Sequence, residues 1–274
     1  MPNNYRPEWT PDEVDMERPS AARMYDYYLG GSHNFAADRA LAEEYMKVLP
    51  DMPHIARAQR GFLHRAIRYV AQNGVDQFLD LGSGIPTVGN VHEIARATTP
   101  GARVVYVDSD PVAVAHSTAL LAEIEGTAVI HADLRNPADV LANPKLTEIL
   151  DLTRPVAVLM IAVLHFVPDE DSPAAVVSAY RDATAPGSYL AITHATSDYQ
   201  PELARRAEAV YTRASHSIVY RTKQGILDLM PGYDLVEPGL ADLIRWRPDP
   251  DAGPDPLGGD DARYSGYAAV GRRP

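Results

Sequence analysis

The sequence contains no cysteine, few basic residues relative to acidic ones, and no long apolar run. The lack of cysteine excludes disulfides, thiolate metal sites and cysteine nucleophiles, and it permits a reducing compartment. The formal net charge of −12 argues against broad nucleic-acid binding, which depends on cationic side chains that displace counterions. No stretch reaches the roughly 18 apolar residues of a membrane helix, and the start has no signal-peptide pattern. We therefore expect a soluble, cytoplasmic protein without a membrane partner.

The composition is that of a folded protein, with 274 residues of which 46% are hydrophobic and 23% charged. Residues 1–19 are rich in Pro, Asp and Glu without periodicity, which predicts a tail or an arm over the surface. Residues 20–73 show apolar residues three and four apart, interrupted by a glycine pair and two prolines, and predict a helical section. Residues 74–274 would form the main domain.

In the main domain, short apolar runs alternate with longer helical patterns, which is typical of a parallel sheet with crossover helices. The runs are nearly unbroken, as expected for strands covered on both faces. The predicted strands are 77–82, 102–110, 127–134, 155–164 and 188–195, and the predicted crossover helices are 88–99, 111–126, 136–151 and 172–185. Four such connections fit five parallel strands.

The last part of the chain has a different pattern. Residues 201–214 predict a helix, and residues 233–248 and 264–273 predict strands. The segment 248–262 is so rich in Pro, Gly and Asp that we expect a long solvated loop between these strands.

A glycine-containing turn follows the first predicted strand, in the order Asp80-Leu81-Gly82-Ser83-Gly84. Glycine permits a sharp turn and lets a ligand approach the backbone, and ligands of open α/β sheets bind outside the carboxyl ends of the strands. Two glycines of this spacing also mark ordinary turns, so the motif alone leaves both interpretations open.

Carboxylates at the ends of the next two strands strengthen the prediction of a site. Asp108 could accept hydrogen bonds from both hydroxyls of a ribose, since Asp110, before Pro111, is the better candidate for the helix cap. Asp133 could accept the exocyclic amine of an adenine, although it could also cap a helix. Three successive strands that end in Asp at one edge are harder to explain by capping than any one of them.

The loop favours a ligand derived from methionine over a dinucleotide. A dinucleotide site typically needs a third small glycine near the pyrophosphate, and Pro86 stands there. Asp80 would repel phosphates, whereas it could hold the ammonium of a methionine moiety. A nicotinamide oxidoreductase is therefore the weaker alternative.

At these residues the chain resembles the class I methyltransferases, and within them a group of bacterial S-adenosyl methyltransferases of unknown substrate. The resemblance runs from ARMYDYYLGGSHNFAADRA through QFLDLGSGIPTVGNVHE and VVYVDSDPVAVAHSTALL to the terminal EPGL and RWRP. It implies a Rossmann-like α/β fold, with a seven-stranded, mostly parallel sheet and an antiparallel last strand, and S-adenosylmethionine as cofactor. The cofactor residues expected in the main domain are Asp80, Leu81, Gly82, Ser83, Gly84, Asp108, Ser109, Asp133, Leu134 and Ala162. Pro86 departs from the family pattern of a third glycine.

The N-terminal section concentrates aromatic, polar and glycine residues before the sheet begins. One interpretation is a lid over the cofactor or acceptor pocket, formed by Tyr28, Gly31, His33, Asn34 and Phe35. The other is that the tyrosines pack along a helix face and the glycine pair ends that helix.

No catalytic acid or base stands out. His165, after the fourth strand, could be a general base or a cofactor neighbour, but a structural role is favoured, and His194 carries the same ambiguity. No metal is expected, because no histidine pair has the spacing of two ligands on one helix. The four arginines between residues 57 and 68 are interpreted as a solvated face, with recognition of an acidic substrate as the alternative.

We expect an enzyme that moves a methyl group from S-adenosylmethionine to an acceptor by direct in-line displacement and leaves S-adenosylhomocysteine. A small-molecule acceptor is favoured, while the acceptor's identity and the oligomeric state are not predicted. The alternative is a non-catalytic module that binds S-adenosylmethionine or S-adenosylhomocysteine and regulates a partner.

Overall fold

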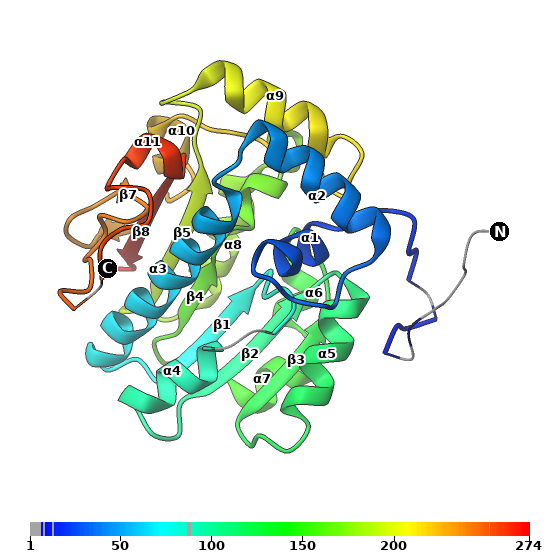
Figure 1. Cartoon of the computed structure of the whole chain (residues 1–274). Coiled ribbons are helices and arrows are strands. Elements are labelled where there is room, and N and C mark those ends of the chain that lie inside the picture. The colour runs from blue at the N-terminus through cyan, green and yellow to red at the C-terminus, as the bar shows by residue number, and fades with distance from the viewer. Residues whose placement is uncertain (1–6, 8, 13, 87–88, 252) are drawn as a thin grey trace.

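The computed structural model describes residues 7, 9–12, 14–86, 89–251 and 253–274. Its centre is one eight-stranded sheet with the order β3-β2-β1-β4-β5-β8-β6, in which β7 also pairs with β8 (Figure 1). The first five strands run parallel, and β8 is antiparallel to its neighbours. The strands are β1 (Gln77–Leu81), β2 (Arg103–Asp108), β3 (Thr127–His131), β4 (Ala157–Met160), β5 (Tyr189–Ala195), β6 (Asp234–Leu235), β7 (Ala241–Asp242) and β8 (Gly266–Arg272).

The four predicted crossover connections are confirmed, and the third consists of two short helices. The helices are α1 (Ala21–Tyr28), α2 (Ala36–Val48), α3 (Met52–Gln72), α4 (Val91–Thr98), α5 (Pro111–Leu121), α6 (Pro137–Leu141), α7 (Pro144–Ile149), α8 (Pro173–Ala183), α9 (Pro201–Tyr211), α10 (Lys223–Leu227) and α11 (Asp261–Tyr264). In the described part of the chain, every helix is too short or too polar to cross a membrane.

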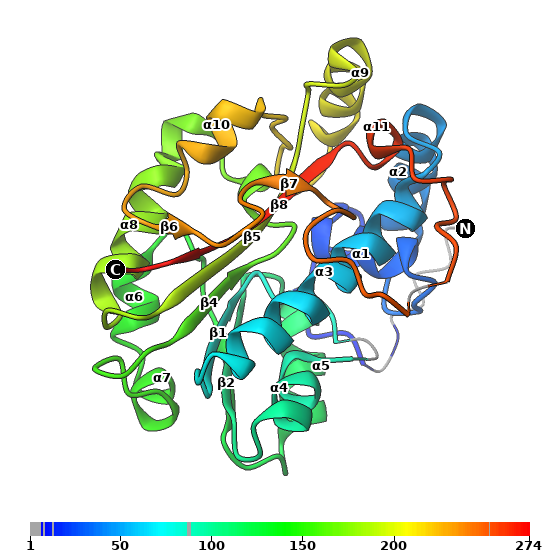
Figure 2. The ribbon, with the colours of Figure 1, turned by 90° about the vertical axis from the view of Figure 1, so that its left-hand side faces the viewer.

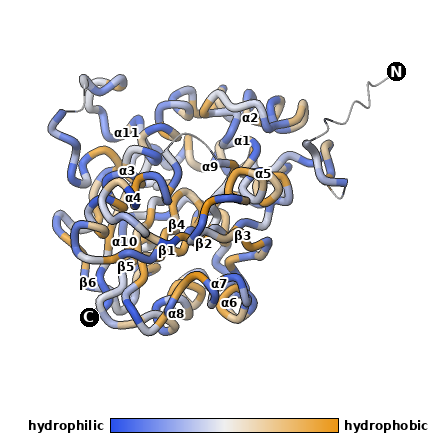
Figure 3. The backbone as a smooth tube through the Cα atoms, turned by 90° about the horizontal axis from the view of Figure 1, so that it is seen from below, coloured by the Kyte–Doolittle hydropathy of each residue, from blue (hydrophilic) through white to orange (hydrophobic). Residues whose placement is uncertain are grey.

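Alternate residues of each central strand belong to different cores, because successive side chains of a strand point to opposite faces. Phe78 belongs to the core that includes α3 and α4, whereas Leu79 belongs to the core that includes α6, α7 and α8. Figure 2 shows these two groups of helices on opposite sides of the sheet. The nearly unbroken apolar strands predicted from the sequence follow from this double cover. In the tube view, α5 is coloured mostly as hydrophobic (Figure 3).

The helical N-terminal section shares its core with the sheet. Buried residues of α1, α2 and α3 form one cluster with strand residues such as Phe78. Within that cluster α2 packs beside α9, where the rings of Tyr45 and Tyr211 meet edge to face with centroids 4.8 Å apart (Figure 1). Of the expected arm, residues 1–6, 8 and 13 lie outside the described residues, and Trp9 stacks on Phe35.

The predicted strand at 233–248 is wrong over most of its length. Only β6 and β7 form there, because Pro238 has no N–H for a ladder and Gly239 turns the chain at φ 83°. The sheet therefore has eight strands instead of seven. The segment after it is not a fully solvated loop either, since Leu257 is buried and α11 follows.

The strand order reverses beside β1, which lies between β2 and β4. In open α/β sheets, ligands bind at the carboxyl ends of the strands at such a point. The loop after β1 does not lead directly into a helix, because α4 begins only at Val91.

Candidate functional site

A cavity of about 370 Å³ opens at the carboxyl ends of the parallel strands. Residues that follow β1 to β5 form one half of its lining, and α1, α2, α3 and the segment from α9 to Tyr220 form much of the other. Of the residues predicted from the sequence, it brings together Asp80, Gly82, Ser83, Gly84, Asp108, Ser109, Asp133, Leu134, Ala162, His165 and Tyr28. Leu81 lies in β1 with its side chain in the core.

The loop after β1 is held by backbone bonds and has open space beside its second glycine. The N–H groups of Gly82 and Ser83 donate to the Val107 carbonyl at 2.8 and 3.1 Å. Both glycines adopt the left-handed conformation, with φ 73° at Gly82 and 65° at Gly84. A Cβ at Gly82 would lie 2.4 Å from the Val163 side chain, whereas a Cβ at Gly84 would meet no atom within 4 Å. A ligand can therefore approach the backbone at Gly84.

Asp108 is not the cap of α5, because Asp110 accepts the N–H groups of Val112 and Ala113 as predicted. Instead, the two carboxylate oxygens of Asp108 accept the N–H groups of Gly84 at 2.7 Å and of Asp110 at 2.8 Å. Burial raises the pKa of Asp108 to about 6, although these backbone bonds oppose the rise. The residue thus ties the glycine loop to β2 and remains at the cavity wall.

Asp80 is the second buried carboxylate of this half. Burial raises its pKa to about 7, the charge of Arg60 opposes that rise, and the charge of Asp108 adds to it. Arg60 also lines the cavity and donates to the Gly89 carbonyl at 2.6 Å. A cationic ligand group would favour the ionised form of Asp80.

The prediction of a solvated arginine face is wrong for two of its four members. Arg60 lies at the cavity, and the half-buried Arg65 donates to the carbonyls of Leu243 and Trp246. Only Arg57 and Arg68 are exposed. Periodicity alone could not reveal this, because long side chains bury their stems while their charged ends reach polar partners.

Asp133 is half-buried and already paired. Arg135 donates to both of its carboxylate oxygens, from the backbone N–H to Oδ1 at 2.9 Å and from the guanidinium to Oδ2 at 2.6 Å, and the guanidinium also reaches Asp171 at 2.8 Å. Partial burial would raise the pKa of Asp133, but the hydrogen bonds and charge of Arg135 outweigh it and lower the pKa. An adenine amine at Asp133 would therefore share this carboxylate with Arg135.

The backbone after β4 is strained at Ala162, where φ is 55°. The Ala162 N–H donates to the Thr193 hydroxyl at 2.8 Å. His165 follows and is buried, and its Nδ1 atom has no hydrogen-bond partner within the described structure. Burial, with the neighbouring His194 and Arg221, holds its pKa well below the ordinary value. His194 lies between the Ala195 carbonyl and the Arg221 guanidinium, at 2.7 and 2.8 Å, and has a structural role.

Four of the five predicted lid residues are not part of the cavity lining. Asn34 donates to Asp26 at 2.8 Å, the His33 N–H donates to the same carboxylate, and Gly31 leaves the space that this carboxylate fills. Phe35 packs between Trp9 and Arg23. The polar groups of this turn are therefore used within the turn, and Tyr28 alone of the five predicted lid residues lines the cavity.

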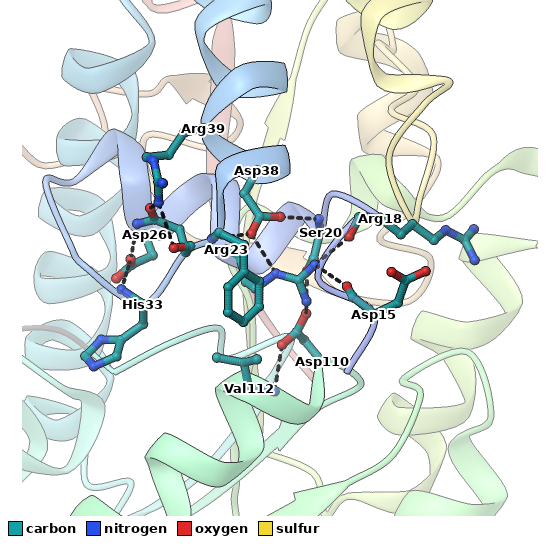
Figure 4. A network of polar contacts seen from close by, with 12 residues as sticks. Asp15, Arg18, Ser20, Arg23, Asp26, His33, Asp38, Arg39, Asp110 and Val112 are labelled. Carbon is teal, nitrogen blue, oxygen red and sulfur yellow. Dashed lines mark hydrogen bonds and ion pairs between the residues drawn. The ribbon is translucent and has the colours of Figure 1, made fainter. Parts of the chain in front are cut away.

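A buried ionic network joins the N-terminal section to the start of α5, at the carboxyl ends of the strands (Figure 4). Arg23 donates to Asp38 at 2.9 Å and to Asp110 at 3.2 Å, and all three side chains are less than a tenth exposed. Asp38 also accepts the N–H groups of Ser20 and Phe35. Because Asp110 caps α5 and its N–H donates to Asp108, the network fixes α1 beside Asp108.

The second half of the cavity is aromatic and apolar. Its tyrosines come from α1, α2, α9 and two later segments, and they are Tyr25, Tyr28, Tyr45, Tyr211, Tyr220 and Tyr264. Leu49, Met52, Ile55, Leu63 and Ile218 also belong to this wall. Sequence reasoning found only Tyr28, because segments more than a hundred residues apart form one wall only after folding. Across the described residues, no group of three or more acidic or histidine side chains could hold a metal ion.

The donor set fits S-adenosylmethionine, because a glycine loop open to a ligand and the buried carboxylates Asp80 and Asp108 line the cavity, and the N-terminus of α5 there is already capped by Asp110. Fold and site together define a Rossmann-like methyltransferase. Residues 7–274 match the family model described as S-adenosyl methyltransferase, and the chain belongs to this family. It is a methyltransferase that depends on S-adenosylmethionine.

Two solved structures are similar over nearly the whole chain. A DUF574 family protein from Streptomyces avermitilis is 38% identical, with a TM-score of 0.90 over 95% of this chain and 99% of that one. A candidate methyltransferase from Thermobifida fusca is 40% identical, with a TM-score of 0.89 over 97% of this chain and 99% of that one. None of the curated proteins matches the sequence.

Proposed function

We propose that the protein methylates a small organic acceptor held against the tyrosine-rich wall, by direct in-line displacement. The observation that carries this proposal is that one cavity runs from the strand-end carboxylates to a wall of apolar and tyrosine side chains. Enclosed, mostly apolar cavities with a few polar groups suit small molecules better than polymers. We propose a cytoplasmic location, since a cysteine-free chain needs no oxidising compartment.

In this proposal, Asp108 holds the ribose hydroxyls and Asp80 the ammonium of the cofactor, with Arg60 near its carboxylate. The backbone from Gly82 to Gly84 lies against the methionine portion, and Asp133 and Leu134 flank the adenine. The buried carboxylates support these roles, because their raised pKa values mark sites that gain from a cation or from hydrogen-bond donors. Ser109 and Ala162 supply further contacts from the cavity wall.

The bound cofactor supplies an electrophilic methyl group on a sulfonium centre. The chain's own contribution is to align the acceptor and to exclude water with its aromatic wall. His165 is a weak proton acceptor, because its pKa is held well below the ordinary value. We therefore assign it a wall and positioning role and expect an acceptor atom that is nucleophilic without strong general-base help.

The N-terminal section would cover the cofactor or acceptor pocket, with Tyr25 and Tyr28 among its contacts in the cavity. The Arg23, Asp38 and Asp110 network supports a cover that is fixed by an ionic anchor and not freely mobile. Hydrogen exchange of residues 20–38 should then slow when S-adenosylhomocysteine binds. Unchanged hydrogen exchange would contradict the proposal that the N-terminal section covers the pocket.

Calorimetric titration of S-adenosylhomocysteine tests the cofactor site. Asp108→Ala should weaken binding roughly 100-fold, because two hydrogen bonds to a charged group are lost. Asp76→Ala is the matched control, since Asp76 lies before β1 at the opposite edge of the sheet and pairs with the exposed Arg154. Equal affinities of the two variants would contradict the assignment.

A screen for transfer of a radiolabelled methyl group to amines, phenols, thiols and peptides then tests catalysis. We expect transfer to at least one small-molecule class. Binding of both cofactor forms without transfer to any class would favour the alternative, a non-catalytic binding module. This alternative is favoured by the burial of His165, which holds its pKa well below the ordinary value and makes it a poor general base.

A further inference from the structure

Gln59 is a polar exception in the apolar part of the cavity wall. It lies on α3 one turn after Ile55 and one turn before Leu63, and all three side chains line the cavity. Residues four apart on a helix share one face, so an apolar side chain would be the simplest choice at this position. Gln59 is only 5% exposed, and its Oε1 atom has no hydrogen-bond partner in the described structure.

Four tyrosine hydroxyls of the same wall are bonded within the protein, whereas the buried Tyr28 hydroxyl, like Gln59 Oε1, has no partner in the described structure. The Tyr25 hydroxyl donates to the Ala56 carbonyl at 3.0 Å, the hydroxyls of Tyr45 and Tyr220 bond to each other, and the Tyr264 hydroxyl donates to Asp255. Buried polar atoms are normally paired, and an unpaired one at a ligand cavity calls for an explanation. A carbonyl oxygen can only accept, so its missing partner is an N–H or O–H group.

The neighbouring Arg60 does not compete for that partner. Its guanidinium is directed to the Gly89 carbonyl, and its charge acts on Asp80, in the carboxylate half of the cavity. Gln59 instead has apolar neighbours on its helix face and tyrosines around the same cavity. None of the residues named above for this wall is charged, and its tyrosines offer flat aromatic surfaces.

We propose that Gln59 determines acceptor specificity: its Oε1 accepts an N–H or O–H group of a neutral, flat ring compound held in the tyrosine-rich half. This inference rests on the proposed function, because it assumes that the carboxylate half holds the cofactor. A site built around a hydrogen bond rejects an analogue that lacks the donor, since the buried acceptor is then left unpaired.

The matched probes are indole and 1-methylindole, which share a ring system and differ in the N–H donor. Each is titrated by calorimetry into the protein saturated with S-adenosylhomocysteine. The wild type should bind indole at least roughly 10-fold more tightly, as expected for one hydrogen bond to a buried acceptor. Gln59→Leu should bind the two probes within about twofold of each other, because the acceptor is gone.

Leucine is similar to glutamine in size, so any steric rejection of the extra methyl group would persist in the variant. Gln72→Leu, at the exposed end of the same helix, is the control and should keep the wild-type preference. Gln59→Leu should also unfold at the same or a higher temperature, because it removes a buried unpaired amide, and a thermal melt verifies that it folds.

Failure of the inference is distinguishable from failure of the proposed function. If the wild type binds S-adenosylhomocysteine but binds neither probe or both equally, the assignment of Gln59 to a ring acceptor is overturned. A preference retained in Gln59→Leu, or a tenfold loss of its S-adenosylhomocysteine affinity, overturns it as well, and the second result moves Gln59 to the cofactor. If the wild type does not bind S-adenosylhomocysteine at all, the proposed function fails first.

Discussion

Replacement of Asp38 by asparagine should strongly destabilise the protein through the buried network in Figure 4. Asp38 is fully buried and accepts three hydrogen bonds, from Arg23 at 2.9 Å, Ser20 at 2.9 Å and Phe35 at 2.8 Å. Asparagine retains one oxygen, so at least one of these donors would face an NH₂ group. The substitution also removes the charge that pairs with Arg23, whose side chain is only 4% exposed.

Breaking a buried ion pair typically costs about 3–5 kcal/mol, because the remaining charge is left without its partner. Arg23 keeps Asp110 and the Arg18 carbonyl, at 3.2 and 2.6 Å, so we expect the lower end of that range, about 3 kcal/mol. Urea unfolding measures the loss. The two tryptophans allow a local and a global report, since Trp9 stacks on Phe35 near the network and Trp246 packs against Phe62 in the core.

Single-tryptophan variants would separate these two signals. We expect the Trp9 transition to shift at least as far as the Trp246 transition. Asp249→Asn is the control, because Asp249 pairs with Arg68 at the surface with both side chains at least a third exposed, and it should cost less than about 1 kcal/mol. A loss below about 1 kcal/mol for Asp38→Asn would show that the network is not an anchor and refute the reasoning.

The remaining predictions concern Asp80 and three glycines in the left-handed conformation. The pKa of Asp80 is raised to about 7, and the ionised carboxylate would attract the ammonium of S-adenosylhomocysteine. The affinity for S-adenosylhomocysteine should therefore rise with pH between about 5 and 8. Calorimetry of Asp80→Asn should show a weaker dependence of affinity on pH. The raised pKa also means that ionisation of Asp80 destabilises the ligand-free fold. The contribution of the protonated carboxyl to stability is therefore complete below the pKa of the unfolded state and is lost as the pH rises through about 7. Urea unfolding of Asp80→Asn should lack this decline. Gly84→Ala and Gly101→Ala, both left-handed positions with open space, should each lose about 1–2 kcal/mol in urea unfolding, but only Gly84→Ala should lose cofactor affinity. Gly82→Ala should lose more stability than either, because its Cβ meets Val163; equal losses at all three positions would contradict the steric argument.

The carboxyl-end edge of the parallel sheet was largely predictable from the sequence. Parallel strands covered on both faces need continuous apolar runs, and such runs are visible from residue 77 to residue 195. The carboxyl ends of parallel strands meet at one edge, so Asp80, Asp108 and Asp133 could be placed together before their contacts were known. The cap at Asp110 was equally local, because an Asp before a proline at a helix start has a defined role.

The N-terminal turn shows where local interpretation ends. Gly31, His33 and Asn34 have the composition of a binding loop, yet their polar groups and space are used by Asp26 within the turn. The pattern could not separate a lid from an internally bonded turn, since both need glycine and polar side chains. The strand predicted at 233–248 failed for a related reason, because the proline and glycine within it mattered more than its apolar residues.

The sequence by itself determined the parallel sheet, the strand-end carboxylates and therefore the kind of cofactor, because these depend on periodicity and on residues next to one another in the chain. Only the tertiary structure decided what lies in the cavity beyond the strand-end carboxylates. Tyrosines from α1, α2 and α9, together with Tyr220, line this part of the cavity with Gln59. They come together because segments far apart in the chain pack against one another. An apolar helix face predicts burial, but only the fold determines whether the face packs in the core or lines a ligand cavity.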